Sequence, residues 1–131
     1  MTRPVRARRT PAADVRPLVV AAASEAADRK GTDIVLLDLR GLTSATDWFV
    51  LATGESDVQV RSIADRIEER LKTEHGTRPW HVEGLPTARW VLLDYVDFVI
   101  HVFHRETRDY YQLERLWADA PSETFPSEAA S

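Results

Sequence analysis

Two short runs of apolar residues, close together in the chain, constrain its fold more than any other feature. Residues 34–39 and residues 47–53 are rich in Ile, Val, Leu and aromatic side chains, and a glycine follows soon after each run. A strand with apolar side chains on both faces must be covered on both sides, which is the usual situation in α/β proteins. We therefore expect a mixed sheet with helices on both faces.

Segments with helical spacing can supply this cover. Asp14 is expected to cap a first helix that ends near Arg29. Ser56, with Gln59 three residues later, has the spacing of a capping box, and the apolar residues that follow recur at helical intervals. A short last helix is predicted at residues 110–117, where Tyr, Leu and Trp recur in the same way.

Three further short strands are predicted in the second half of the chain, at residues 79–82, 89–94 and 97–103, with turn residues between them. The last two are expected to pair as a hairpin. The predicted order is α-β-β-α-β-β-β-α, and the predicted fold class is α/β, with a mixed sheet of about five strands.

The two ends differ in charge from the rest of the chain. Residues 1–13 contain four arginines and no acid, and residues 119–131 contain three acids and no base. Both ends are predicted to be disordered, a basic arm and an acidic tail around a single domain at residues 14–118. That domain carries more acids than bases, which suits a basic protein partner better than nucleic acid.

Composition excludes several classes of protein. The chain has no cysteine, so disulfides, thiol nucleophiles and thiolate metal sites are excluded. No apolar run is long enough to span a membrane, and the first residues lack the apolar core of a secretory signal. We expect a cytoplasmic protein.

The turn at residues 52–57, between a predicted strand and helix, resembles a phosphate site in its position, because a helix N-terminus offers free N–H groups to an anion. The turn contains one glycine and lacks the lysine of a P-loop. Glu55 and Asp57 place negative charge where a phosphate would bind. Helix capping explains this turn better.

The histidine pair His101 and His104 suggests a metal site, but side chains three residues apart on a strand point to opposite faces. We expect no metal site and interpret His101 as an ordered polar side chain at the sheet surface. A role for His101 as a general base stays open.

Four carboxylates at predicted strand ends give an alternative, a metal-dependent nucleotidyltransferase-like enzyme or phosphoesterase. Such enzymes usually need paired acids directed at one point, and the sequence has no such pair. Acids at strand ends also serve as turn residues, which we favour. The four are Asp38, Asp47, Asp94 and Asp97.

Aromatic residues are dense for a chain of this size, which contains four Trp and three Tyr. Such side chains are enriched at the centres of protein interfaces. Alternation along residues 97–103 predicts one apolar face and one mixed face, and Trp90 lies beside the mixed face. This mixed face is the candidate contact surface for a protein partner.

Three segments, residues 46–65, 82–103 and 108–117, resemble the Iojap-like ribosomal silencing factors. They contain the motifs Thr-Asp-Trp, Ala-Thr-Gly, Glu-Gly, His-Val-Phe and Tyr-Gln-Leu-Glu-Arg-Leu-Trp in this order. One departure is Val96, where the family often has glycine, so the shape of that turn is expected to differ.

The resemblance implies a nucleotidyltransferase-like sheet without catalytic acids, in a protein that is not an enzyme, needs no cofactor and is a homodimer when free. It implies binding to the large ribosomal subunit through ribosomal protein L-fourteen. Steric exclusion of the small subunit would then repress translation under nutrient limitation. The basic arm is expected to make at most a minor contact with ribosomal RNA.

By position, the resemblance also implies a set of partner-binding residues. Among them, Trp90 and Tyr111 are expected to be anchors, and Glu114 is expected to pair with a basic side chain of the partner. The full set is Trp90, His101, Phe103, Arg108, Tyr111, Glu114 and Trp117, with Asp47 and Glu83 as polar supports.

Overall fold

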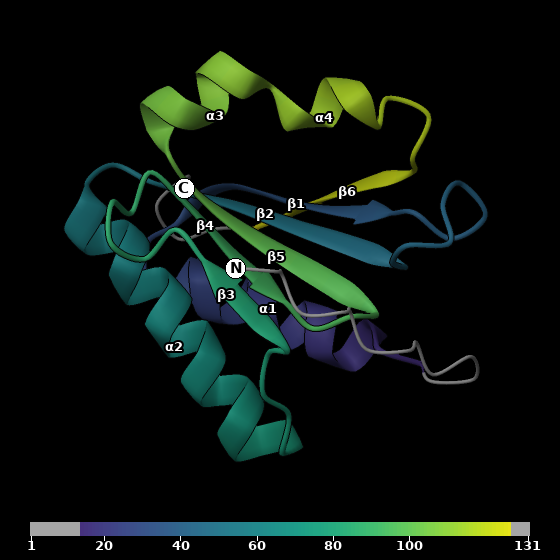
Figure 1. The fold of residues 1–131 in the computed structure, drawn as a ribbon, viewed down its shortest axis with the longest axis horizontal. Coiled ribbons are helices and arrows are strands. Elements are labelled where there is room, and N and C mark those ends of the chain that lie inside the picture. Colours follow the sequence, from purple (N-terminus) through teal and green to yellow (C-terminus); the bar gives the residue numbers. More distant parts are fainter. Residues whose placement is uncertain (1–13, 127–131) are drawn as a thin grey trace, which may run out of the picture.

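The computed structural model describes residues 14–126 and shows a six-stranded mixed sheet with helices on both faces (Figure 1). This confirms the predicted fold class. The elements are α1 (Arg16–Asp28), β1 (Thr32–Asp38), β2 (Trp48–Gly54), α2 (Asp57–His75), β3 (His81–Glu83), β4 (Trp90–Asp94), β5 (Phe98–His104), α3 (Arg105–Tyr111), α4 (Leu113–Leu116) and β6 (Ser122–Phe125).

The strand order in the sheet is β3-β4-β5-β2-β1-β6. The central strands β2 and β5 are parallel, whereas every other neighbouring pair is antiparallel. The predicted hairpin of β4 and β5 is present, and the first five strands begin and end within one or two residues of their predicted limits. The two apolar runs therefore form β1 and β2 inside the sheet, where both faces are covered.

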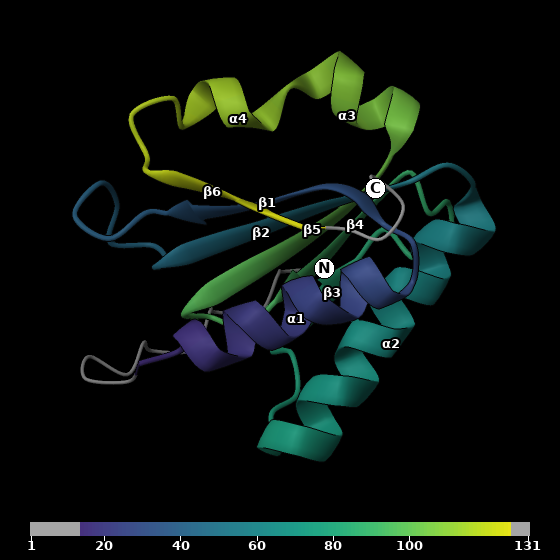
Figure 2. The same ribbon diagram turned by 180° about the vertical axis from the view of Figure 1, so that it is seen from behind.

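Helices α1 and α2 pack side by side on one face of the sheet (Figure 2). Ser56 Oγ accepts a hydrogen bond from the Gln59 N–H at 3.1 Å, and Gln59 Oε1 accepts one from the Glu55 N–H at 2.7 Å. The first bond confirms Ser56 as the predicted cap, the second ties Gln59 to the residue before the cap, and α2 ends at Gly76 in a left-handed conformation. The main core lies beneath these helices and includes Val60, Ile63, Ile67, Leu71, Val50, Ile100 and Val102.

Helices α3 and α4 lie on the opposite face of the sheet (Figure 1). The prediction of one short helix at residues 110–117 was wrong in its limits, because α3 already begins at Arg105, with His104 as its cap. Gln112 adopts a left-handed conformation with φ of 48° and separates α3 from α4. The start of α3 has no pattern of apolar residues that predicts a helix, because the buried side chain of this helix belongs to a charged residue, Arg108.

The prediction that residues 119–131 form a tail outside the fold was wrong for Ser122–Phe125, which pairs with β1 as β6. Backbone hydrogen bonds at a sheet edge need no apolar side chains, so residues 122–125 carry no apolar pattern that predicts a strand. Arg16 in α1 and Glu123 in β6 form a 2.9 Å ion pair that ties the two ends of the domain together. The predicted arm at residues 1–13 and the last residues of the tail, 127–131, lie outside the described residues.

Candidate functional site

One face of β2, β4 and β5 is turned toward α3 and α4, and the strand register places its side chains in rows. Trp90 on β4 lies opposite Phe103 on β5, and Leu92 lies opposite His101. Leu51 on β2 is next to His101 on the other side. Most of the residues predicted to bind a partner belong to this face or to the helices above it.

His101 is buried, with 4% of its surface exposed, so its predicted place at the sheet surface was wrong. The Trp90 indole Nε1 donates a hydrogen bond of 3.0 Å to His101 Nδ1. Burial lowers the pKa of His101 to about 3, and the ring is therefore neutral near pH 7. Because Nδ1 accepts from Trp90, the single ring proton must be on Nε2.

Trp90, Tyr111 and Tyr110 form a continuous set of aromatic rings, which we call the aromatic ridge. The ring centroids are 5.2 Å apart for Trp90 and Tyr111, and 4.9 Å apart for Tyr111 and Tyr110. Trp90 is half-buried, whereas Tyr111 and Tyr110 are 57% and 80% exposed. Large exposed aromatic side chains on a rigid base are typical of interface anchors.

Arg108 attaches α3, the helix that carries Tyr110 and Tyr111, to the sheet. Its Nη1 donates to Thr53 Oγ1 at 2.8 Å and to the carbonyl oxygen of Asp33, while its Nε donates to Glu114 at 3.0 Å. Arg108 is buried, so these bonds fix α3 to β1 and β2. Glu114 was expected to pair with a basic side chain of a partner, but in the structure it pairs with Arg108 of its own chain.

Phe103 is fully buried, so it lacks the exposed surface that a partner contact requires. It packs in a second core cluster with Leu51 and Leu113, and its ring centroid is 4.8 Å from that of Trp90. Trp117 is partly buried against the same cluster and meets Phe49 edge-on at 5.8 Å. Phe103 therefore supports the ridge from inside the core.

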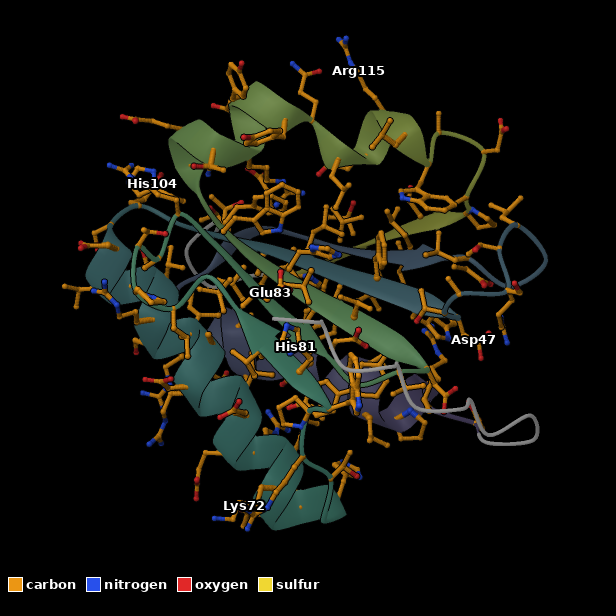
Figure 3. The ribbon with its side chains drawn as sticks, viewed as in Figure 1. Asp47, Lys72, His81, Glu83, His104 and Arg115 are labelled. Atoms are coloured by element: carbon orange, nitrogen blue, oxygen red, sulfur yellow. The ribbon has the colours of Figure 1, made fainter. Side chains whose placement is uncertain are left out.

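The two polar supports lie apart from each other. Glu83 on β3 is opposite Leu92, and its Oε1 lies 2.8 Å from Nε2 of His81. Asp47 precedes β2 at the far end of the sheet (Figure 3). The start of β2 is opposite the start of β5, while Trp90 is opposite Phe103 near the end of β5. The structure thus brings Glu83 close to the ridge and leaves Asp47 away from it.

A pocket of about 440 Å³ continues the same sheet face past His101. This pocket was not predicted, although alternation along β4 already places Leu92 and Asp94 on the same face as Trp90. Leu116 on α4, 76% exposed, was also missed as a surface residue. The pocket is lined by Thr43, Ala45, Thr46, Phe49, Trp80, Leu92, Asp94, Val99, His101 and Trp117.

The carboxylates considered for an enzyme do not converge. Within residues 14–126, no group of three or more His, Asp or Glu side chains is placed to hold a metal ion. Asp38 pairs with Arg40 at 2.8 Å, and Asp94 accepts a hydrogen bond from the Val96 N–H. His104 accepts one from the Glu106 N–H as the cap of α3. These side chains shape turns and caps.

No helix in the described part of the chain is long and apolar enough to cross a membrane.

Comparison with known proteins gives a family. Residues 12–131 match the family described as ribosomal silencing factor during starvation. The chain is 44% identical over 100 residues to the ribosomal silencing factor RsfS of Bacillus subtilis, which covers 76% of this chain and 84% of the relative. It is 32% identical over 107 residues to an Iojap-related mitochondrial protein of Arabidopsis thaliana, covering 78% and 57% of the two chains.

Solved structures agree with this result. A crystal structure of a Chromobacterium violaceum protein superposes with a TM-score of 0.77 at 34% identity, covering 91% of this chain and all of the other. A Bacillus halodurans protein superposes with a TM-score of 0.72 at 35% identity, covering 84% and 99%. The sequence match over nearly the whole described domain, together with this likeness of fold, shows that the chain belongs to the ribosomal silencing factor family.

Proposed function

We propose that this chain carries out the ribosome-associated silencing role of its family by docking on the large ribosomal subunit through ribosomal protein L-fourteen. The bound protein would occupy the face that meets the small subunit, so that the two subunits cannot join and translation is repressed under nutrient limitation. The observation that carries the proposal is the exposed aromatic ridge of Trp90, Tyr111 and Tyr110, held on a buried base.

Steric exclusion of the small subunit requires only that the protein binds in the right place. An interface of ordinary size, about 800 Å² per partner, is sufficient if it contains well-placed anchors. The ridge supplies exposed aromatic area, and the bond from Trp90 to His101 and the contacts of Arg108 reduce its freedom before binding. A rigid anchor loses less entropy on binding than a mobile one. No catalytic step is needed, and we propose that the chain is not an enzyme.

Charge supports a basic partner. The whole chain has a net charge of −4, and Glu83 lies on β3 close to the ridge. Opposite charge at the edge of an interface mainly steers the encounter and speeds association. We further propose a cytoplasmic protein that is a homodimer when free, with at most a minor contact between the basic N-terminal arm and ribosomal RNA.

Sedimentation of purified ribosomal subunits tests the proposal. The protein should migrate with the large subunit and reduce the amount of joined ribosome. Trp90→Ala and Tyr111→Ala should weaken both effects, whereas Val58→Ala, which alters an exposed residue of α2 on the opposite face, should leave them unchanged. Normal binding by both ridge variants, with their fold intact, would contradict the assignment of the ridge.

A further inference from the structure

The pocket beside His101 contains buried polar atoms that the fold does not use. Thr46 and His101 are 3% and 4% exposed, and both line the pocket. Thr46 Oγ1 and His101 Nε2 have no hydrogen-bond partner among the described residues. A buried polar atom without a partner costs about 1–3 kcal/mol, so a fold that keeps two of them at one pocket is suited to a ligand that supplies the partners.

The direction of the hydrogen bond at His101 defines what such a ligand must offer. Because Nδ1 accepts from Trp90, Nε2 carries the proton and is a donor. The ligand must therefore present an acceptor to His101. The Thr46 hydroxyl can donate or accept, and the Asp94 carboxylate at the pocket can accept only. A carbonyl next to an N–H donor therefore supplies partners for His101 Nε2 and Thr46 Oγ1.

The walls of the pocket define the rest of the ligand. Phe49, Trp80 and Trp117 offer aromatic surfaces, and Leu92 and Val99 are aliphatic. Aromatic walls favour a flat ring, which can stack on them or meet them edge-on. Asp94 is the acidic residue among the described residues that line the pocket, and a negative ligand is therefore disfavoured. The volume of about 440 Å³ is within the range of small-molecule sites.

We propose that this pocket binds a small, uncharged, planar lactam, the cyclic amide group found in uracil, with its carbonyl oxygen on His101 Nε2 and its N–H on Thr46 Oγ1. The proposal does not rest on the proposed function. The pocket lies beside the aromatic ridge and shares His101 with it, but its ligand can be tested with the isolated chain and without ribosomes.

The test is a nuclear magnetic resonance titration of the full ¹⁵N-labelled chain with two lactams, uracil and quinolin-2-one. Saturable shifts are expected at the indole N–H of Trp80 and Trp117 and at Nε2–H of His101. Trp48 belongs to the core cluster on the other face, and its indole signal should not move. Benzoate serves as the anionic control and toluene as the control without polar groups. Absence of saturable shifts with both lactams would overturn the proposal, as would equal shifts with the two controls.

Two variants locate the binding. Thr46→Val has nearly the same shape and removes the hydroxyl, so it should weaken lactam binding about two- to tenfold, the effect of one neutral hydrogen bond, and leave toluene unaffected. Ala45→Phe narrows the pocket from an exposed position and should abolish binding. Val58→Thr is the matched control on the opposite face. If lactams bind Thr46→Val and Ala45→Phe as tightly as they bind the original chain, the site lies elsewhere and the proposal is wrong.

Discussion

The indole Nε1 of Trp90 donates a 3.0 Å hydrogen bond to Nδ1 of His101, which joins a half-exposed aromatic ring to a buried residue of the neighbouring strand. The bond fixes the orientation of Trp90 and sets the tautomer of His101. It explains how a surface anchor can be rigid, although only part of its ring lies in the core. The buried His101 thus fixes the position of an aromatic ring at the surface, through its hydrogen bond with Trp90.

Replacing His101 with Phe keeps an aromatic ring of similar size but removes the acceptor for Trp90. We expect the Trp90 indole N–H signal to shift toward its solvent value, while the free energy of unfolding at pH 7 changes little, because the lost hydrogen bond and the removal of the unpartnered Nε2 oppose each other. Urea unfolding and the NMR spectrum measure the two effects. His75→Phe, at an exposed position of α2, is the control, and an unshifted Trp90 signal in His101→Phe would contradict the role of the bond.

The stability of the fold should fall as the pH is lowered from about 6.5. The pKa of His101 is lowered from 6.5 to about 3 by burial, so below pH 6.5 the unfolded chain binds a proton that the folded chain excludes. At pH 5 this costs about 2 kcal/mol relative to pH 7. Denaturant unfolding at pH 7, 6 and 5 measures the loss, and His101→Phe should remove most of this pH dependence. An equal dependence in that variant would assign it to other groups.

Val96→Gly should stabilise the protein. Val96 has a φ of 73° in the turn between β4 and β5, which is strained for a β-branched residue. We expect a gain of about 1 kcal/mol in the free energy of unfolding. Arg66→Gly, at an exposed position in the middle of α2, should instead lose about 1 kcal/mol. A loss in both variants would show that Val96 is not strained.

Arg108→Ala should weaken the attachment of α3 to the sheet. The change leaves the Asp33 carbonyl and Thr53 hydroxyl without their donor and should cost about 3 kcal/mol. Amide hydrogen exchange should accelerate first in α3 while β5 stays protected. Glu114→Gln keeps a hydrogen-bond acceptor for Arg108 and should cost much less. Equal protection of α3 in Arg108→Ala would contradict this role.

The strands and helices in the middle of the fold were predictable from the sequence. The two apolar runs gave β1 and β2, and the cap at Ser56 gave the start of α2, because burial on both faces and capping leave strong local patterns. Strand β6 was not predictable in this way. It is polar and exposed, and its pairing with β1 depends on backbone groups that every residue has.

The candidate site was predictable in part. Trp90 and Tyr111 are at the surface as expected, but His101, Phe103 and Arg108 are buried under or beside α3. Alternation along a strand shows which side chains share a face and does not show which helix covers it. A buried arginine gives no apolar signal. The likeness to nucleotidyltransferases and the homodimer stay predictions.

The deciding measurement is the binding of the large ribosomal subunit by the original chain and by the double variant Trp90→Ala, Tyr111→Ala, with Val58→Ala as control. The original chain and the control should sediment with the large subunit and prevent joining of the small subunit. The double variant, if its NMR spectrum shows an intact fold, should stay unbound and leave joining unaffected. Equal binding by the double variant would show that the aromatic ridge is not the docking surface.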